Sequence, residues 1–331
     1  MRALTIVDSR LEIAERPVPE PGDGEVLVRV HGAGLNRADL LQRAGRYPAP
    51  AGVPADIPGL EFAGVVEGVG ADVTDLEVGA RVFAITAGGA QAEYVVVPAR
   101  QCAVVPDGLD LVAMGGVPEA FITAHDAMIT QARLQPGEWL LVHAVGSGVG
   151  TTALQLGKAF GARVAGTARS ADKLDRCVAI GLDAPITPST TADGTLDIDA
   201  LAFAVIEATG TGADVTLDLA GGSYLEASVN AAAPKGRIVS IGSVAGGRAS
   251  LPIVGVMGKR LTIMGTVLRA RTVEEKGQAT DAFVRDVVPL LADRRVAPIV
   301  ETVVPLDEAE RAYDLLASDA TFGKVILDCT R

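Results

Sequence analysis

The sequence predicts an α/β protein that combines a β-rich domain with a doubly wound parallel sheet. Three observations support this fold class. Short β-like runs separated by turn residues fill positions 1–105. A glycine-rich turn near residue 146 follows an apolar run and precedes a helical pattern. From Trp139 onward, apolar strands alternate with helical stretches, which is typical of a parallel sheet with helices on both faces.

Length and charge narrow the function classes. The chain has 331 residues, of which 49% are hydrophobic, so we expect two domains with substantial cores. The 29 basic and 41 acidic residues give a formal net charge of −12. This acidity disfavours binding to nucleic acid or to an anionic membrane surface.

The sequence also points to a compartment. No apolar run approaches the roughly 20 residues of a membrane-spanning helix, and the first 17 residues lack the apolar core of a signal peptide. Cys102, Cys177 and Cys329 are far apart and form no C-x-x-C pair, which favours reduced thiols. We therefore expect a cytoplasmic protein.

The β-rich part begins with a strand–turn–strand pattern and ends near a helix at 119–131. Its other expected strands share β-branched residues bounded by Gly, Pro and Asp. The expected strands lie at 3–7, 25–30, 64–69, 81–85 and 92–97.

The alternating part has longer elements, and its polar, Thr- and Asp-rich stretch 183–200 is expected to be a loop. Strands are expected at 139–144, 163–167, 214–219, 237–241 and 261–267, and helices up to about 160, at 171–180 and at 223–233. The C-terminal part should contain a helix at 274–293, a strand at 300–304, a helix at 306–318 and a strand at 324–328.

The glycine-rich turn, Gly146-Ser147-Gly148-Val149-Gly150, is the main cofactor signal. Glycines there let the backbone approach a pyrophosphate, and the following helix offers free N–H groups. Thr151 stands where the usual pattern has its last glycine. Such a turn also occurs in α/β proteins without a dinucleotide, so the flanking residues have to decide.

The end of the next strand favours NADP(H) over NAD. An NAD-binding fold places a carboxylate about 20 residues after the glycine turn, whereas here the strand ends in Ala168, Arg169 and Ser170, with Lys173 one turn later. Cationic and hydroxyl donors suit a 2′-phosphate. The alternative is an ordinary solvated helix start.

Two further strand ends carry small residues. Ala220 and Gly221 follow one strand, and Ile241, Gly242 and Ser243 follow the next. Ligands of doubly wound sheets bind at the carboxyl edge of the strands, so these positions are candidates for the ribose and nicotinamide. The alternative is that they serve only the turns themselves.

Several motifs together resemble a known family. They are Asn36-Arg37-Ala38-Asp39, Arg43-x-Gly45-x-Tyr47-Pro48, Pro58-Gly59-Leu60-Glu61, the glycine turn, Asp218 with Gly221-Gly222, and Leu268-Arg269. The chain resembles the medium-chain dehydrogenase/reductase superfamily, and within it the zeta-crystallin-type quinone oxidoreductases. The resemblance implies a GroES-like catalytic domain of residues 1–118 and 269–331 and an inserted Rossmann domain of residues 119–268. It places the active site in the cleft between them.

The chain lacks the zinc ligands that the resemblance would lead us to look for. Zinc alcohol dehydrogenases of the superfamily have Cys near position 36 and His at position 60, where this chain has Asn36 and Leu60. The cysteines of the structural zinc are also missing, and His31, His125 and His143 have no metal-ligand spacing. We therefore expect no metal, and without a Lewis acid the reduction of an electron-poor acceptor is easier than alcohol oxidation.

The expected function is an NADPH-dependent quinone oxidoreductase that transfers hydride to a quinone or similar conjugated carbonyl without zinc. The first alternative is an NADPH-dependent 2-enoyl or alkenal reductase. The second is a non-enzymatic NADPH-binding protein. The small-molecule acceptor is the only partner expected besides a second copy of the chain.

The resemblance also implies site residues. The candidate catalytic residues are Tyr47, Asn36 and Ser147, with Tyr47 either polarising the acceptor oxygen or forming a wall. Asp39 is expected to cap a helix. The cofactor-binding residues would be Asn36, Thr123, Gly146, Ser147, Gly148, Val149, Gly150, Thr167, Arg169, Ser170, Lys173, Ala220, Gly221, Ile241, Gly242, Ser243, Leu268, Arg269, Phe322 and Lys324.

The run 261–267 predicts a homodimer. It contains no charge and no proline, and it should lie at the sheet edge, where unpaired backbone groups invite another strand. In relatives this strand pairs with its two-fold copy. The alternative is an edge covered by a helix of the same chain.

Overall fold

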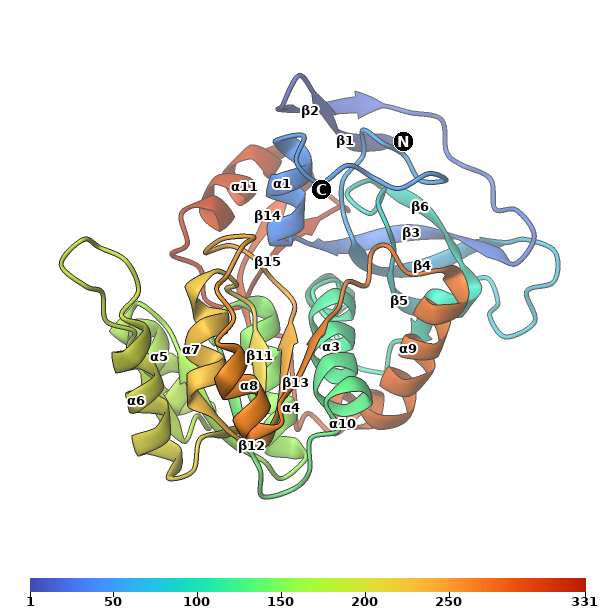
Figure 1. Ribbon diagram of the computed structural model, residues 1–331. Helices are drawn as coiled ribbons and strands as arrows, with labels where there is room; N and C mark the ends of the chain where they lie inside the picture. The colour runs from blue at the N-terminus through green and yellow to red at the C-terminus, as the bar shows by residue number, and fades with distance from the viewer. The chain divides into compact units, whose positions relative to one another are not determined.

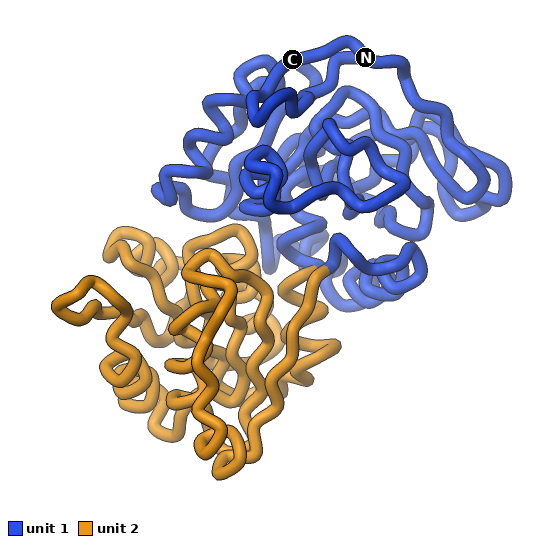
Figure 2. The backbone as a smooth tube through the Cα atoms, turned by 45° about the horizontal axis from the view of Figure 1, so that its top comes forward, with its two compact units in different colours: residues 1–122, 268–331 blue, residues 123–267 orange.

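The computed structural model describes residues 1–331, which form two compact units (Figure 2). Unit 1 comprises residues 1–122 and 268–331, and unit 2 comprises residues 123–267. The chain thus enters unit 2 once and then returns to unit 1.

Unit 1 is built on a seven-stranded sheet in the order β14-β15-β3-β4-β5-β7, with β6 also paired to β3 (Figure 1). Val26, Val28 and Val30 alternate along β3 and are buried in the core, which is the period of a strand with one face inward. The strands are β3 (Glu25–Gly34), β4 (Glu61–Val69), β5 (Arg81–Ile85), β6 (Tyr94–Pro98), β7 (Cys102–Val104), β14 (Val300–Pro305) and β15 (Lys324–Asp328).

The remaining elements of unit 1 are a β-hairpin and several helical segments. The hairpin of β1 (Arg2–Val7) and β2 (Arg10–Glu15) forms a separate two-stranded sheet. The helical segments are α1 (Arg37–Arg43), η1 (Ala99–Gln101), α2 (Leu111–Met114), α9 (Val273–Asp286), α10 (Val288–Ala292), η3 (Leu306–Glu308) and α11 (Ala309–Ala317). The Asn36 N–H donates to Asp39 Oδ2 at the start of α1 (2.8 Å), which confirms the capping role expected for Asp39.

Unit 2 contains the doubly wound sheet. Its six strands are all parallel in the order β10-β9-β8-β11-β12-β13, which is the dinucleotide-binding topology. All four residues of β8 are buried, as expected for a strand covered on both faces. The strands are β8 (Trp139–Val142), β9 (Arg163–Thr167), β10 (Ala184–Ile186), β11 (Ala213–Asp218), β12 (Ala232–Ser240) and β13 (Thr262–Gly265).

Helices cover both faces of this sheet, with α7 and α8 in front of it and α4 behind it in Figure 1. They are α4 (Gly148–Ala159), α5 (Ala171–Ala179), α6 (Ile198–Thr209), α7 (Ser223–Ala231) and α8 (Ile253–Lys259). Helix α3 (Pro118–His125) precedes them and continues into the π-helical turn η2 (Asp126–Gln131). None of the helices is both long enough and apolar enough to cross a lipid bilayer.

Two expectations about elements are wrong. The stretch 183–200 is not a loop throughout, because Ala184–Ile186 pairs with β9 and α6 begins at Ile198. Asp197 caps that helix by accepting from the Ala200 N–H (3.0 Å). The expected helix 274–293 is two helices, because Pro289 has no N–H for continuous helical bonding.

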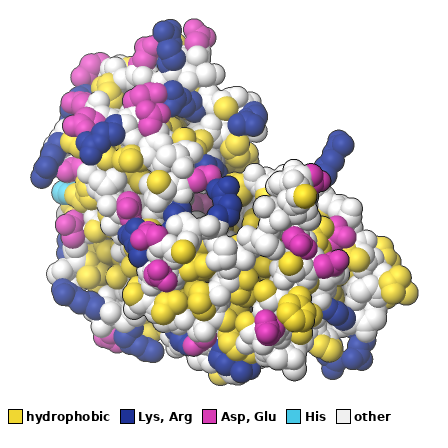
Figure 3. Space-filling model, turned by 90° about the vertical axis from the view of Figure 1, so that its left-hand side faces the viewer, with side chains coloured by type: hydrophobic (Ala, Val, Ile, Leu, Met, Phe, Trp, Pro, Cys, Tyr) yellow, Lys and Arg dark blue, Asp and Glu magenta, His cyan; other side chains and the backbone are white.

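The surface carries charges of both signs. On the face drawn in Figure 3, Lys and Arg side chains lie among Asp and Glu side chains and form no continuous basic stripe. The sequence has 29 basic and 41 acidic residues, which give a formal net charge of −12.

Candidate active site

The glycine-rich turn has the geometry of an anion site. Ser147 is the N-cap of α4, and its hydroxyl oxygen accepts from the Gly150 N–H (3.1 Å). A Cβ at Gly150 would lie 2.5 Å from the Ala144 carbonyl oxygen, so only glycine allows this tight turn. The N–H groups of Gly148 and Val149 have no acceptor within the helix. They fit a pyrophosphate oxygen.

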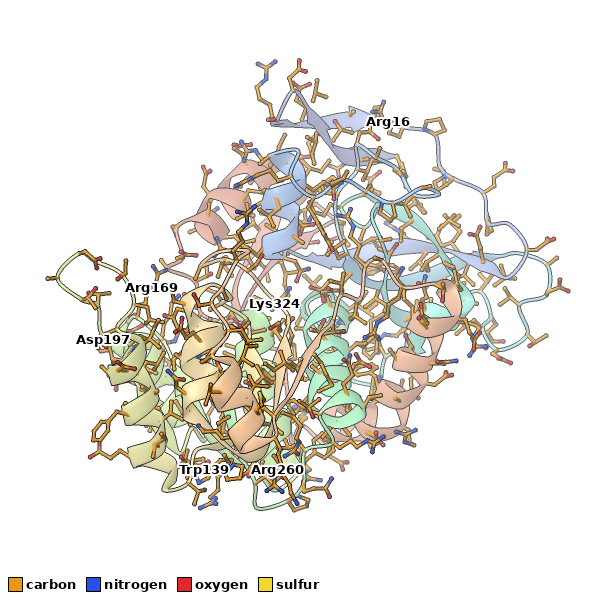
Figure 4. The ribbon with its side chains drawn as sticks, in the orientation of Figure 1. Arg16, Trp139, Arg169, Asp197, Arg260 and Lys324 are labelled. Carbon is orange, nitrogen blue, oxygen red and sulfur yellow. The ribbon has the colours of Figure 1, made fainter.

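The end of β9 lies beside this turn. Thr167 is buried, and its carbonyl oxygen accepts from the Val145 N–H (3.0 Å). Ser170 is exposed and caps α5, where its hydroxyl oxygen faces the Lys173 N–H at 3.5 Å. Arg169 is exposed and lies at the opposite end of the unit from Trp139, the first residue of β8 (Figure 4). The basic residues therefore lie at the carboxyl edge of the strands.

A buried aspartate organises the next strand end. Asp218 Oδ1 accepts from the N–H groups of Ala220 (3.0 Å) and Gly221 (2.7 Å). Its backbone oxygen accepts from the Ile241 N–H (2.9 Å). Burial raises the pKa of Asp218. A Cβ at Gly221 would lie 2.8 Å from Ser243 Cα, so the two expected strand ends meet closely at this edge.

His143 lies under the same edge. Its Nδ1 is 3.0 Å from Thr167 Oγ1 and its Nε2 is 2.9 Å from Ser228 Oγ. Burial lowers the pKa of His143 to about 3, so the ring is neutral. Its edge packs against the Tyr224 ring with centroids 4.9 Å apart, and the charge of Arg169 acts on the Tyr224 hydroxyl. His143 therefore supports Tyr224 beside the basic residues.

In unit 1, one carboxylate joins three elements. Lys324 Nζ donates to Glu61 Oε1 (2.5 Å), Asn36 Oδ1 (2.8 Å) and the Leu35 carbonyl oxygen (2.7 Å). Asn36 Nδ2 also donates to Glu61 Oε1 (2.9 Å) and to the Gly34 carbonyl oxygen (3.3 Å). The Glu61 and Lys324 side chains are 0% and 5% exposed. All three ammonium hydrogens of Lys324 are used, so its side chain fixes Asn36 and Glu61.

This arrangement does not fit a zinc ion. Leu60 is buried and has no donor atom, and the Asn36 amide is held by neighbouring groups. The Lys324 ammonium beside Glu61 would repel a second cation. No cluster of three or more His, Cys, Asp or Glu side chains could hold a metal ion.

Arg269 holds the segment that carries Tyr47. The guanidinium donates from Nε to the Ala87 carbonyl oxygen (2.8 Å), from Nη1 to the Tyr47 carbonyl oxygen (3.0 Å) and from Nη2 to Gln42 Oε1 (2.6 Å). It also lies 4.7 Å from the centre of the Tyr47 ring. Arg269 is 5% exposed, and its three acceptors all belong to unit 1.

The Tyr47 hydroxyl has no hydrogen bond to the protein, whereas the Tyr47 backbone oxygen accepts from Arg269. Burial raises the pKa of this phenol, and the Arg269 charge acts in the opposite direction. Tyr47 is therefore protonated at neutral pH and has a donor available for another molecule.

The structure divides the expected site residues between the units. Those of unit 1 are Asn36, Tyr47, Leu268, Arg269, Phe322 and Lys324, and those of unit 2 are Thr123, Gly146, Ser147, Gly148, Val149, Gly150, Thr167, Arg169, Ser170, Lys173, Ala220, Gly221, Ile241, Gly242 and Ser243.

The sequence pattern indicates no role for Glu119, Lys276 or Tyr224. A lone carboxylate in the apolar run 117–124 was the available signal for Glu119. Tyr224 and Lys276 gave none, because their contacts come from distant parts of the chain.

Two family profiles match this chain, one in each part of the sequence. A family profile described as "Alcohol dehydrogenase GroES-like domain" matches residues 22–107, and one described as "Zinc-binding dehydrogenase" matches residues 148–285. A quinone oxidoreductase of Pseudomonas aeruginosa is 32% identical over 325 residues, which are 96% of this chain and 95% of that protein. The chain belongs to the quinone oxidoreductases of the medium-chain dehydrogenase/reductase family.

Two further similarities bear on cofactor and acceptor. The crystal structure of the Thermus thermophilus quinone oxidoreductase, described also in complex with NADPH, has a TM-score of 0.83 at 32% identity and covers 99% of this chain and 100% of that one. The polyketide synthase component PikAII of Streptomyces venezuelae is 40% identical over 231 residues. These residues are 69% of this chain, and the match spans only 6% of PikAII.

The Glu61–Lys324 pair generates a stability prediction. Lys324→Met leaves a buried carboxylate without its cation and should cost about 3–5 kcal/mol. The exposed pair Arg311–Glu308 is the control, and Arg311→Met should cost less than about 1 kcal/mol. Urea denaturation of both variants measures the free energy of unfolding. Equal losses in the two variants would show that the buried pair stabilises the protein no more than the exposed pair does.

Proposed function

We propose that the protein is an NADPH-dependent oxidoreductase that reduces a quinone or similar conjugated carbonyl acceptor without zinc. The observation that carries the proposal is the unbonded Tyr47 hydroxyl, held beside Arg269 in a unit whose donor set does not fit zinc. An electron-poor acceptor needs its oxygen polarised, and a phenol can do this where a metal cannot be held.

NADPH, when bound, supplies a hydride from C4 of its nicotinamide. The cofactor role proposed for the glycine turn is pyrophosphate binding, through the N–H groups of Gly148 and Val149 and the Ser147 hydroxyl. Since that hydroxyl also caps α4, we assign Ser147 to the cofactor rather than to the acceptor. Arg169, Ser170 and Lys173 are proposed to hold the 2′-phosphate. The Thermus thermophilus relative, described in complex with NADPH, supports this choice.

In the acceptor region, Asn36 and Tyr47 have different proposed roles. The Asn36 amide is oriented by Lys324 and Glu61 and keeps one lone pair on Oδ1 for a donor of the cofactor or acceptor. Tyr47 is proposed to donate its hydroxyl hydrogen to the acceptor oxygen. Lys324, with all its hydrogens used, would contribute to the cofactor region only through its neighbours and its backbone.

A second candidate function is the reduction of a 2-enoyl or alkenal double bond. The 40% identity to a polyketide synthase component favours it, because hydride donors to conjugated thioesters use the same cofactor and fold. Both reactions add hydride to a conjugated system, so the same residues serve either one.

The acceptor class is tested directly by measuring NADPH oxidation with ortho- and para-quinones, alkenals and enoyl thioesters. The proposal expects kcat/KM to be highest for quinones. A preference for enoyl thioesters would select the second candidate, and inactivity with every conjugated acceptor would contradict both.

Cofactor choice generates a prediction for Arg169 and Lys173. Hydrogen bonds to charged groups are worth roughly 1.5–3 kcal/mol each, so Arg169→Ala with Lys173→Ala should weaken NADPH binding about 100-fold or more and leave NADH nearly unchanged. Titration calorimetry measures both affinities.

The matched control is Arg294→Ala with Arg295→Ala, which removes two exposed cations from unit 1 and should change neither affinity. Equal affinities of the unmodified protein for NADH and NADPH would rule out the assignment of the 2′-phosphate.

We also propose a homodimer through β13. This strand ends the sheet and pairs only with β12, so its other edge can accept a strand. Exposed apolar residues lie on α8, where Val254 is 84% and Met257 is 71% exposed. Two-fold pairing of β13 would extend the sheet, and isologous contacts of this kind are the commonest oligomer geometry.

Ile263→Pro tests this proposal. The Thr266 N–H donates to Ser240 of β12, so by alternation the Ile263 N–H points to the open edge. Proline at this position removes a donor from that edge, so the variant should be a monomer by light scattering, while Ile263→Leu should keep the dimer. If the unmodified protein is itself a monomer at micromolar concentration, the edge does not mediate dimerisation.

A further inference from the structure

Helix α3 is buried at every position except one. Of its eight residues, only Glu119 in the first turn is partly exposed. Phe121 and Ile122 are in the core at 0% and 1% exposure. Placing a carboxyl in the first turn of an otherwise buried helix costs free energy unless the group has partners or stays neutral.

The position of Glu119 is fixed through its backbone. Its N–H donates to Glu61 Oε2 (2.8 Å), and the other oxygen of Glu61 holds Lys324 and Asn36. The start of α3 is therefore tied to the same buried carboxylate as Asn36. The Glu119 carboxyl itself has no hydrogen bond or ion pair with the protein, although all its neighbours in this network do.

Charged and titratable groups from several elements face this carboxyl. Glu61 of β4, Lys324 of β15, Asp39 of α1 and Lys276 of α9 act on it. It also acts on Tyr47, which follows α1, and on Arg269, which precedes α9. The charges of Glu61 and Lys324 are paired with each other. The Glu119 carboxyl thus shares its surroundings with the phenol proposed to contact the acceptor.

Burial raises the pKa of Glu119 to about 8, and the neighbouring Glu61 adds to the shift while Lys324 opposes it. The group therefore keeps its proton at neutral pH. Carboxylic acids held neutral by their surroundings serve as proton donors in other enzymes. In this unit, Lys324 has no hydrogen to spare and Tyr47 alone would have to regain its proton after each turnover.

Resting on the function proposed above, we propose that Glu119 is a further catalytic residue, the acid that delivers the proton accompanying the hydride. Hydride addition leaves an anion on the acceptor. The O–H bond of Glu119 breaks and a new bond to hydrogen forms on that anion, directly or through the Tyr47 hydroxyl. The Glu119 carboxylate then takes a proton from water. The hydride brings both electrons, so no other reductant is needed.

The chemistry predicts a dependence on acceptor class. A quinone that has received hydride becomes a stabilised phenolate, which water protonates readily. An alkenal becomes an enolate, whose carbon must receive a proton before the product can form. The loss of an internal acid should therefore slow alkenal reduction more than quinone reduction.

Kinetics of Glu119→Gln test the proposal. Glutamine keeps the shape but has no transferable proton, so kcat with an alkenal should fall about 100-fold or more, with a smaller fall for a quinone and little change in NADPH affinity. In the unmodified protein kcat should decline as the pH rises through about 8, the pKa of Glu119, and the variant should lose this decline. Glu274→Gln, at an exposed position of α9, is the matched control and should leave kcat and its pH profile unchanged.

A second readout does not depend on turnover. The folded protein binds the Glu119 proton more tightly than the unfolded chain, because folding raises the pKa from 4.5 to about 8. The stabilisation is complete below the unfolded value and is lost as the pH rises through the folded value. Urea midpoints should therefore fall between about pH 5 and about pH 8 in the unmodified protein and fall less in Glu119→Gln.

The outcomes separate the two proposals. If the unmodified protein is active and Glu119→Gln keeps kcat within about twofold, with the same pH profile, Glu119 is not the acid and the proposed function stands. If the urea midpoints of both proteins fall equally with pH, Glu119 is not protonated at neutral pH and the inference is wrong. If the unmodified protein reduces no conjugated acceptor, the proposed function and the inference fail together.

Discussion

The buried pair of Glu61 and Lys324 is the interaction on which the rest of unit 1 depends. Two opposite charges at 0% and 5% exposure are stable only if their remaining hydrogen-bonding groups are satisfied. Here those groups are the Asn36 amide, the Leu35 carbonyl and the Glu119 N–H. The pair therefore fixes the start of α1, the start of α3 and the last strand around one carboxylate.

This arrangement constrains the chemistry. The resemblance implies that zinc enzymes of the superfamily have metal ligands at the positions of Asn36 and Leu60, whereas in this chain a lysine ammonium already bound to three acceptors lies beside Asn36. This ammonium orients its neighbours but has no hydrogen left to donate to an acceptor oxygen. In the function proposed above, polarisation of the acceptor would fall to neutral donors, of which the Tyr47 hydroxyl is unbonded and the Glu119 carboxyl has a pKa raised to about 8 by burial. Neutral donors suit acceptors that already take hydride easily, such as quinones and conjugated carbonyls.

Features encoded by neighbouring residues could be predicted from the sequence. The strand, glycine turn and helix at 139–159 depend on residues within about 20 positions of one another, so periodicity and glycine spacing identify them. The parallel sheet and its edge strand follow from the same alternation. Strand β10 has only three residues and therefore carries no periodic signal. The break at Val287 does not show in the hydrophobic pattern, because only Pro289 interrupts an otherwise helical run.

The roles of long side chains could not be predicted in this way. Lys324 and Arg269 were placed with the cofactor on the resemblance, but their charged groups bind acceptors 263 and 227 residues away along the chain, at Glu61 and Gln42. A sequence does not show which distant carbonyl an arginine reaches. The environment of Glu119 is hidden in the sequence for the same reason, since the charged groups around it come from four other segments.

The central claim is that hydride passes from NADPH to a conjugated acceptor with no metal involved. The most direct measurement is to deplete the protein of metals by exhaustive chelation, verify the depletion by elemental analysis, and follow deuterium from C4-labelled NADPH into the product. The account predicts deuterium transfer at the rate of the untreated protein. Loss of transfer on chelation, restored by stoichiometric zinc, would contradict it.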